Sequence, residues 1–515
     1  MRVRSARPAL VLLLALAACK PPVAAEGELP FPSLIPAPVL LDQFDGRYTL
    51  DATTRIHAPG DPDGDAVADL LAEALRPATG LALEVVEDGG DDGIELVLDP
   101  TLDLPAEGYT VDVDETGVTI AAGDVAGLFH GTQTFRQLLP PQVYAVTAVD
   151  DVVWELPAVS IEDSPRFGWR GAMLDVARHF YTVAEVERQI DLLALHKLNR
   201  LHLHLTDDQG WRIEIRAWPE LTEVGGSTEV GGGEGGYYTQ GDYAALVEYA
   251  AARQVVVIPE IDFPGHANAA LSSYGELNES GAPVAPYTGT GVISTPLWLD
   301  GPDTHRFVTD VWGEVAALTP GPWMHVGGDE AVDISQADYD TFVGWLQTVS
   351  SDNGKTMIGW DEIGPVPLDA PFVAQHWFDE DNALAAVAQG AQLVSSPAEH
   401  TYLDMRHDSS ADYGQVWAGR IDVERAYDWE PVPEGLAEGD VLGVEGALWT
   451  EYVDTEEKLD FMLWPRLVAH AEVGWTADEG RVWEDFRERL GHHGARLYVL
   501  DVGFYDSSEM EWEKP

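Results

Sequence analysis

From residue 165 onward, short apolar segments alternate with longer amphipathic ones, and this alternation constrains the fold more than any other feature. Eight segments have the length and apolar composition of buried strands: Trp169–Val176, Arg200–Thr206, Val255–Ile261, Trp323–Gly327, Thr356–Trp360, Phe372–His376, Gln392–Ser395 and Val441–Gly446. Helical periodicity is found in Val183–Leu195, Asp242–Ala252, Thr304–Leu318, Ala385–Gln389, Glu457–Val473 and Trp483–Leu490. This succession of strands and helices predicts an α/β fold, a (β/α)8 TIM barrel.

A doubly wound open sheet is the alternative fold for the same alternation. Such sheets that bind dinucleotides carry a Gly-rich fingerprint between a strand and the following helix. No such fingerprint follows any of the eight segments. The barrel is therefore the preferred interpretation.

The sequence before the barrel has mostly strand-like segments and two helical ones, a pattern that predicts a small α+β domain. Strands are expected at Ile94–Leu98, Tyr109–Val113 and Val118–Ala121, and helices at Ala66–Leu75 and Asp124–Leu139. We place this domain at residues 33–162, the barrel at 163–500 and a C-terminal tail at 501–515. No catalytic constellation is visible in the N-terminal domain.

The first residues have the pattern of an export signal. A basic start precedes the apolar stretch Ala9–Ala18, which is too short to span a bilayer as a mature helix. The stretch ends in Leu16-Ala17-Ala18-Cys19, which resembles the cleavage box of bacterial lipoproteins. We therefore expect a signal peptide over 1–19, with Cys19 as the lipidated first mature residue, and a tether over 20–32.

Lys20 after the cysteine favours the outer membrane or cell surface of a Gram-negative bacterium. The alternative is a simple export signal with an incidental cysteine. Cys19 is the only cysteine in the chain, so no internal disulfide can form.

The formal net charge of -60 excludes one class of partner. Nucleic acids need a basic protein surface, and here acidic residues outnumber basic ones throughout the chain. A solvated acidic surface that maintains solubility is the simplest interpretation, and a saline habitat is the alternative. The lipid anchor is then the only expected contact with a membrane.

Polar residues follow the predicted strands, where TIM barrels hold their catalytic groups. The ends carry Asp175 to His179, Asp207-Asp208, Glu260 to Asp262, Asp329-Glu330, Asp361-Glu362, His376-Trp377, Glu399 to Asp404, and Trp449 with Glu451. The stretch MHVGGDEA, residues 324–331, sets two adjacent carboxylates after a pair of glycines. Those glycines allow a sharp turn that would expose Asp329 and Glu330 at the barrel mouth.

Adjacent carboxylates favour one kind of glycoside hydrolysis. Ordinary mechanisms place two carboxylates on opposite sides of the sugar, whereas neighbouring residues more naturally lie on the same side. This favours the substrate-assisted mechanism, in which the 2-acetamido oxygen of the sugar attacks the anomeric carbon. We expect the charge of Asp329 to raise the pKa of Glu330 and keep it protonated. A capping pair at a helix N-terminus is the alternative interpretation.

Several long motifs resemble glycoside hydrolase family 20, the β-N-acetylhexosaminidases. They are DSPRFGWRGAMLDVARHF (163–180), LNRLHLHLTDDQGWRIEI (198–215), VVVIPEIDFPGHANAAL (255–271), HVGGDEA (325–331), TYLDM (401–405) and EGALWTEY (445–452). The resemblance covers about residues 165–500, and the N-terminal segment is more weakly similar to the domain that precedes such barrels. It implies an exo-acting, retaining enzyme that removes terminal N-acetylglucosamine or N-acetylgalactosamine from oligosaccharides or glycoconjugates without a cofactor or metal.

The resemblance also implies roles for individual residues. Glu330 would be the general acid/base, Asp329 would orient the acetamido group, and Tyr402 would hydrogen-bond its oxygen. The substrate-binding residues would be Arg178 at the 3- and 4-hydroxyls, Asp404 and Glu451 near O4 and O6, and Trp360, Trp377 and Trp449 around the acetamido methyl and the ring. Asp207 and His266 would support the catalytic carboxylates.

Two other functions stay open on the sequence alone. His202 and His204 alternate on one strand and, with His266, could hold the metal of an amidohydrolase, although packed barrel histidines explain the pair as well. A surface glycan-binding lipoprotein without catalysis is the second. The oligomeric state and the natural glycan are not readable from the sequence.

Two segments depart from the family pattern. The chain between Glu330 and Trp360 is short, so we expect the fourth helix and its loops to be trimmed compared with many members of the family, and this region could admit a disaccharide unit. Residues 225–236 are unusually rich in glycine, and we expect a mobile loop at the rim of the site.

Overall fold

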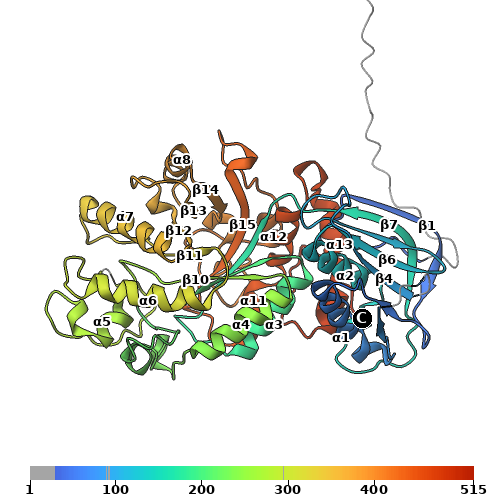
Figure 1. The fold of residues 1–515 in the computed structure, drawn as a ribbon, viewed down its shortest axis with the longest axis horizontal. Coiled ribbons are helices and arrows are strands. Elements are labelled where there is room, and N and C mark those ends of the chain that lie inside the picture. The colour runs from blue at the N-terminus through green and yellow to red at the C-terminus, as the bar shows by residue number, and fades with distance from the viewer. Residues whose placement is uncertain (1–28, 88–89, 91–92, 294) are drawn as a thin grey trace, which may run out of the picture.

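The computed structural model of this chain describes residues 29–87, 90, 93–293 and 295–515. The predicted signal peptide, Cys19 and the first part of the tether lie outside the described residues. Figure 1 shows a small domain built on a sheet at one end and a larger barrel at the other. The predicted fold class, a TIM barrel preceded by an α+β domain, is confirmed.

All eight predicted barrel strands are present. They are β8 (Trp169–Asp175), β9 (Arg200–His204), β10 (Val256–Glu260), β11 (Trp323–His325), β12 (Thr356–Trp360), β13 (Val373–His376), β14 (Gln392–Ser395) and β15 (Val441–Leu448). Every neighbouring pair is parallel, and β15 closes the barrel against β8. Because the chain forms a closed barrel, the alternative of an open sheet is wrong.

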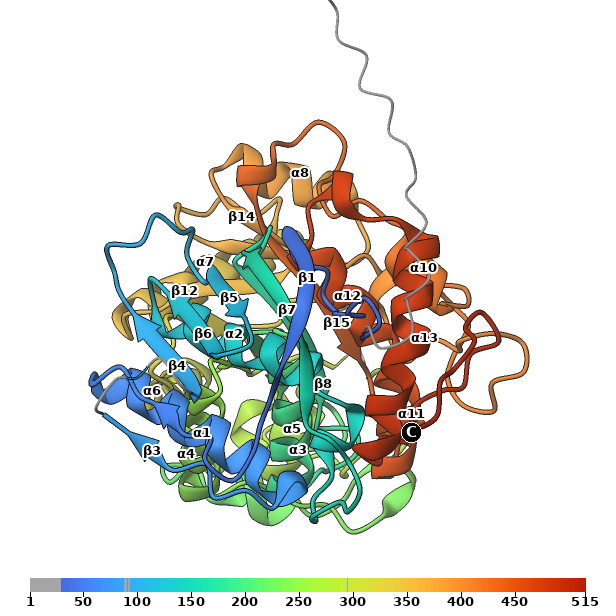
Figure 2. The same cartoon turned by 90° about the vertical axis from the view of Figure 1, so that its right-hand side faces the viewer.

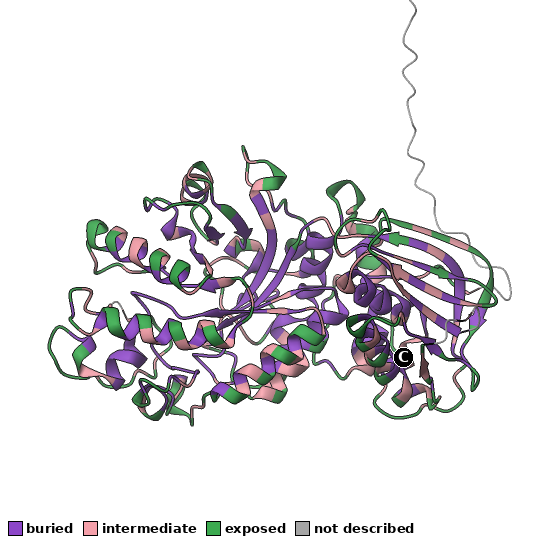
Figure 3. Cartoon of the chain, viewed as in Figure 1, coloured by how far each residue is buried: buried purple, intermediate pink, exposed green. Residues whose placement is uncertain are grey.

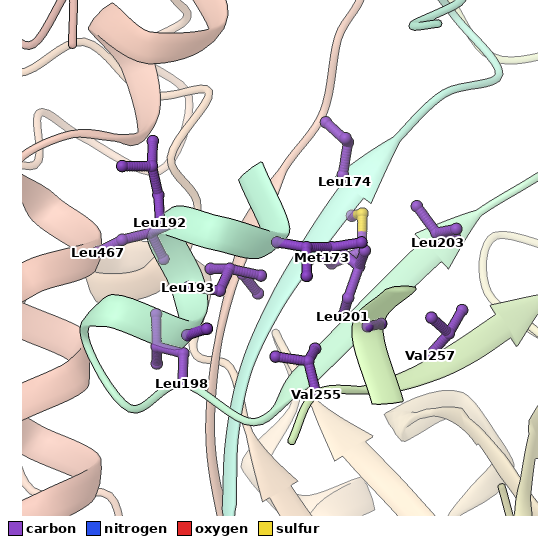
Figure 4. Packing of buried hydrophobic residues seen from close by; sticks show 14 of the residues in the cluster. Met173, Leu174, Leu192, Leu193, Leu198, Leu201, Leu203, Val255, Val257 and Leu467 are labelled. Carbon is purple, nitrogen blue, oxygen red and sulfur yellow. The ribbon is translucent and has the colours of Figure 1, made fainter. Parts of the chain in front are cut away.

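Alternation along the strands sorts apolar from polar side chains, as in β9. Leu201 and Leu203 are fully buried and belong to the main hydrophobic core, in which Leu193 of α3 also takes part. Figure 4 shows these leucines with residues of β8 and β10. Because successive side chains of a strand point to opposite faces, His202 and His204 point into the barrel interior.

Helices surround the barrel, and the longer outer ones bury one face and expose the other, as the colours of Figure 3 show. They are α3 (Val183–Leu195), α4 (Gln240–Ala252), α5 (Asn268–Ser273), α6 (Thr304–Leu318), α7 (Gln336–Asp352), α8 (Glu380–Ala388), α9 (Ala398–Thr401), α10 (Val423–Tyr427), α11 (Glu456–Leu463), α12 (Arg466–Trp475) and α13 (Trp483–Val499). A capping box between Thr182 and Glu185 begins α3. Among the described residues, no helix is long and apolar enough to cross a membrane.

One expectation about helices is wrong. The predicted single helix over 457–473 is two helices, α11 and α12, because Pro465 lies between them and lacks the N–H that a continuous helix needs. The fourth barrel helix, α7, has 17 residues and fills most of the chain between Glu330 and Trp360, so the connections on either side of it are short.

The N-terminal domain is a seven-stranded sheet with two helices. Its order is β1 (Leu40–Thr49), β7 (Glu155–Asp163), β5 (Tyr109–Val113), β6 (Gly117–Ala122), β4 (Gly93–Leu98), β2 (Ile56–His57) and β3 (Val85–Val86). The helices α1 (Pro62–Thr79) and α2 (Val125–Leu138) lie between the sheet and the barrel (Figures 1 and 2). Arg170 of the barrel pairs with Glu107 of this domain at 2.6 Å.

Candidate active site

A glycine turn after β11 shapes the centre of the site. Gly327 and Gly328 have φ of +68° and +97°. A Cβ at Gly327 would lie 1.8 Å from Oδ1 of Asp262, so only glycine fits there. The same Oδ1 accepts a hydrogen bond from the N–H of Gly328 at 3.1 Å. The turn therefore packs directly against the end of β10.

Asp329 and Glu330 leave this turn side by side but enter different surroundings. The Asp329 side chain is 9% exposed and that of Glu330 is 44% exposed. Nε2 of His266 lies 3.5 Å from Oδ2 of Asp329 and 3.4 Å from Oε2 of Glu330. One side-chain nitrogen or oxygen atom from each of these three residues lies within 4.8 Å of the other two. Both carboxylates therefore face the same region, as their adjacency predicts.

The protonation of the pair differs from the prediction. Hydrogen bonding to His266, together with the positive charge of that histidine, lowers the pKa of Glu330 below its usual value. Burial and the charge of Asp262 raise the pKa of Asp329 well above its usual value. The prediction that Asp329 raises the pKa of Glu330 is therefore wrong for the free protein. In this fold Asp262 and His266, both from the segment after β10, decide which carboxyl holds the proton.

Asp262 and Asp329 form a buried carboxyl pair. Burial, followed by neighbouring charges, raises the pKa of Asp262 to about 7, and its side chain hydrogen-bonds to Asp329. One oxygen of each, Oδ2 of Asp262 and Oδ1 of Asp329, has no hydrogen-bond donor among the described residues. Two carboxyl groups can hydrogen-bond to each other only if one carries a proton, so their contact favours one proton on the pair.

A chain of ion pairs leads away from Glu330. Nδ1 of His266 lies 3.2 Å from Oδ1 of Asp207, and the second oxygen of Asp207 lies 2.8 Å from both Nη2 of Arg178 and Nε2 of His204. Burial lowers the pKa of His266, but the carboxylates of Asp207 and Asp329 raise it well above its usual value. His266 is therefore an imidazolium beside the catalytic pair.

Arg178 is held rigidly by its neighbours. Its Nε donates to Gln209 Oε1 at 3.1 Å and its Nη1 to Asp175 Oδ2 at 3.2 Å, and the guanidinium lies over the ring of Trp449.

The glycine-rich segment 225–236 accepts hydrogen bonds from buried Arg212 at Gly226, Thr228 and Gly236. These bonds anchor the segment and argue against its predicted mobility.

Four aromatic side chains form an aromatic cluster next to the pair: Trp360, Trp377, Tyr402 and Trp449. Trp377 stacks on Tyr402 at 9° and 5.9 Å between ring centres. Trp449 lies 5.7 Å from Trp360 and 6.2 Å from Tyr402. All four come from the carboxyl ends of barrel strands or the loops that follow, where the sequence placed them. Flat faces of this kind suit a sugar ring and an acetamido methyl.

Two further predicted residues carry buried oxygens that have no hydrogen-bond partner in the part of the chain that the structure describes. They are Oδ1 of Asp404 and Oε2 of Glu451. Burial raises the pKa of both carboxyls, that of Asp404 well above its usual value. Buried polar atoms are normally hydrogen-bonded, so these oxygens are suited to bind hydroxyl groups of a ligand.

Three residues of the site were missing from the predicted set. Asp262 appears in the sequence only as one of several polar residues after a strand. Glu362 accepts a hydrogen bond from Nε1 of Trp377 at 3.0 Å, and burial raises its pKa to about 8. Trp417 packs edge-on against Tyr402 and is half exposed. It lies on a loop between β14 and β15 with no strand pattern to mark it.

The three histidines of the amidohydrolase hypothesis do not converge. His202 and His204 contact the carboxylates of Glu260, Glu445 and Asp207 inside the barrel, whereas His266 lies beside Asp329 and Glu330. Among the described residues, no group with metal-binding geometry contains all three. The hypothesis therefore lacks its ligand set, and ion pairing accounts for these histidines.

Comparison with known proteins identifies the family. The model of the glycosyl hydrolase family 20 catalytic domain matches residues 167–478, and that of domain 2 of the same family matches residues 31–164. The chain belongs to glycosyl hydrolase family 20. It is 41% identical over 496 residues to a β-N-acetylhexosaminidase of Cellulomonas fimi, and the alignment covers 95% of this chain and 98% of the relative.

Solved structures of the family superpose closely on the chain. The β-N-acetylhexosaminidase of Streptomyces coelicolor has a TM-score of 0.91 at 43% identity, and the match covers 94% of this chain and 99% of the other. The Streptomyces plicatus enzyme, solved with the ligand thio-NAglucal, has the same score and identity, with coverage of 96% and 99%. This family 20 chain thus shares its fold with these enzymes over nearly its whole length.

Proposed function

We propose that this chain is an exo-acting β-N-acetylhexosaminidase that removes terminal N-acetylglucosamine or N-acetylgalactosamine from glycans. The observation that carries the proposal is the pair Asp329 and Glu330, which face the same region beside the aromatic cluster. Such a pair suits substrate-assisted hydrolysis with retention of configuration, in which the acetamido oxygen is the nucleophile and the intermediate is an oxazolinium ion.

Glu330 is assigned the role of general acid and base. Its carboxyl is half exposed in the free protein, and hydrogen bonding to His266 lowers its pKa. A bound sugar would cover this carboxyl, and desolvation raises the pKa of a carboxylic acid. Glu330 would then donate its proton to the leaving oxygen and later take one from the attacking water.

Asp329 is assigned the role of orienting the acetamido group. As a carboxylate it would accept the acetamido N–H and stabilise the positive charge of the oxazolinium ion. Its partner Asp262 can hold the shared proton when Asp329 is ionised, because the two side chains are hydrogen-bonded. The negative charge can thus move from Asp262 to Asp329 within the pair, whose total charge stays the same.

The remaining residues are assigned to substrate binding. Tyr402 would donate its hydroxyl to the acetamido oxygen, and Arg178 would bind the vicinal 3- and 4-hydroxyls with its planar fork. Asp404 and Glu451, whose free oxygens are buried, would accept hydrogen bonds from hydroxyls near O4 and O6. The tryptophans of the aromatic cluster would enclose the acetamido methyl and stack on the ring.

The first experiment measures nitrophenol release from the β-N-acetylglucosaminide and from the plain β-glucoside. It compares the chain starting after Cys19 with its Glu330→Gln variant. We expect cleavage of the acetamido sugar alone and a large loss in the variant. Cleavage of both sugars at equal rates contradicts the substrate-assisted mechanism. Lack of cleavage of either sugar, with retained binding of N-acetylglucosamine, favours the non-catalytic glycan-binding alternative.

We also propose that the protein is exported and lipid-anchored at Cys19, on the Gram-negative outer membrane or cell surface. The support is the leader sequence with its Leu16-Ala17-Ala18-Cys19 box and the following Lys20. Labelling of expressing bacteria with radioactive palmitate should mark the native chain and not Cys19→Ser. Equal labelling of both, or of neither, contradicts the anchor.

A further inference from the structure

Glu260, the last residue of β10, contacts both the ion pairs that lead to Glu330 and the aromatic cluster. Its side chain is fully buried in the barrel. Oε2 accepts a hydrogen bond from Nδ1 of His204 at 2.6 Å, and Oε1 accepts one from Nε1 of Trp360 at 2.9 Å. Nε2 of His202 lies 2.9 Å from Oε2, and Nδ1 of His325 lies 3.2 Å from Oε1. Both oxygens are thus surrounded by nitrogen atoms of the barrel interior.

Strand register produces this arrangement. Glu260 is the register partner of His204 on β9 and of His325 on β11. Residues in register on adjacent parallel strands point to the same side, so these side chains form one layer inside the barrel. A carboxylate in this layer is needed to balance the imidazolium groups, because a buried charge without a partner is costly.

The first connection leads from Glu260 to the acid/base residue. His204 holds Glu260 with Nδ1 and Asp207 with Nε2, at 2.6 and 2.8 Å. With a carboxylate at each nitrogen, His204 is an imidazolium that donates on both sides. Asp207 in turn contacts His266, which lies beside Glu330. A displacement of His204 would therefore reach Glu330 through Asp207 and His266.

The second connection leads from Glu260 to the aromatic cluster. The indole of Trp360 has one N–H, and Oε1 of Glu260 accepts it. Trp360 is buried and packs against Trp449. The hydrogen bond fixes the rotation of the indole, because an alternative orientation would leave a buried N–H and a buried oxygen unpaired.

We propose that Glu260 is a positioning residue. It fixes the position of His204, which leads through Asp207 and His266 to Glu330, relative to the position of Trp360 in the aromatic cluster. The inference rests on the proposed function, in which Glu330 transfers the proton and Trp360 borders the acetamido group. Glu260 itself touches neither, so its effect on catalysis passes through His204 and Trp360.

The test compares Glu260→Gln with Glu445→Gln in the full mature chain. Glu445 is an equally buried barrel carboxylate that accepts from Trp169, His202 and Gln375 at 2.9 Å each. The Glu445 side chain contacts neither His204 nor Trp360 within hydrogen-bonding distance, so it is the matched control. If the amide oxygen of glutamine at 260 accepts from Trp360, its N–H2 faces Nδ1 of His204, which can keep the contact only by losing its Nδ1 proton and its positive charge. In the opposite orientation the N–H2 faces the N–H of Trp360, and that connection is broken.

Three kinetic readouts separate positioning from a structural role. They are kcat/KM for nitrophenyl N-acetylglucosaminide, kcat/KM for the disaccharide of two β-1,4-linked N-acetylglucosamines, and the ratio of acetamido sugar to plain glucoside. The disaccharide has the poorer leaving group and depends more on protonation by Glu330. We expect Glu260→Gln to lower kcat/KM by about 100-fold, the cost of a small misplacement, with a changed ratio between substrates. Glu445→Gln should leave the ratios unchanged.

Single-connection variants keep the proposal testable if Glu260→Gln does not fold. Trp360→Phe removes the indole N–H together with one ring of the side chain and should raise KM for acetamido substrates, with unchanged leaving-group dependence. His204→Asn removes the other connection and should reduce cleavage of the disaccharide more than that of the nitrophenyl substrate. Equal substrate ratios in Glu260→Gln and Glu445→Gln, or in both single-connection variants and the native chain, overturn the inference. If the native chain itself does not prefer the acetamido sugar, the proposed function fails instead.

Discussion

A methyl group added at Gly327 probes the turn that delivers Asp329 and Glu330 to the site. Gly327 has φ +68°, and the new Cβ would lie 1.8 Å from Oδ1 of Asp262. The left-handed backbone costs an L-residue about 1–2 kcal/mol. Displacing Asp262 also breaks its hydrogen bond with the N–H of Gly328, a loss of roughly 1–3 kcal/mol. Gly327→Ala should therefore lower the free energy of unfolding by about 2–5 kcal/mol.

The same change should reduce catalysis through Asp329. Asp262 is hydrogen-bonded to Asp329, so a shift of one moves the other. A misplacement on the order of 1 Å lowers catalysis by roughly 100-fold. Urea unfolding followed by tryptophan fluorescence gives the stability, and kcat/KM for the nitrophenyl N-acetylglucosaminide gives the activity.

Gly344 in α7 supplies a control, because alanine there should raise the free energy of unfolding and not lower it. It has ordinary helical φ, and a Cβ there would meet no heavy atom within 4 Å. Because alanine restricts the unfolded chain and favours a helix, Gly344→Ala should stabilise the protein by about 0.5–1 kcal/mol. Equal stability of the two variants, with full activity of Gly327→Ala, refutes the reasoning about the turn.

Three further predictions address charge, hydrogen bonding and metal. Asp262 has a folded pKa of about 7, above its unfolded value, so it binds a proton more strongly in the folded state and its contribution to stability falls as pH rises from about 4 to 7. Asp262→Asn should flatten that decline in urea unfolding at several pH values. Tyr402→Phe should lower kcat for acetamido substrates by about 100-fold with intact folding, as measured by kinetics and circular dichroism. Dialysis against a chelator should leave kcat/KM unchanged, and a loss restored by added zinc would revive the amidohydrolase hypothesis.

The barrel was predictable because its strands are buried on both faces and read as short apolar runs. All eight were found, and α3 and α6 agree with their predicted ends; at the start of α3 a capping box coincides with the apolar spacing. The break between α11 and α12 was missed because the apolar periodicity continues across Pro465. Local periodicity does not register the loss of one backbone N–H, whereas the helix cannot continue without it.

The sequence predicted which residues form the site, but it did not predict which carboxyl group of the pair binds its proton more strongly. Tyr402, Trp377 and Glu451 are far apart in sequence, yet each follows a barrel strand, and parallel strands bring their carboxyl ends to one edge. The pKa of Glu330 could not be read from its neighbour Asp329. It depends on His266, which approaches from another strand, and sequence adjacency carries no information about that contact.

The end of β10 and the segment after it therefore provide the contacts on which the chemistry of Asp329 and Glu330 in the HVGGDEA motif depends. That segment supplies Asp262 to Asp329 and His266 to Glu330, and Glu260 holds Trp360 and His204. Glu330 itself has φ +48°, a left-handed backbone conformation, and its side chain is more exposed than that of Asp329. Two adjacent carboxylates thus obtain opposite proton affinities from one neighbouring loop. A family 20 chain that kept HVGGDEA but lost the acidic and histidine positions of this loop would retain the motif without the paired chemistry.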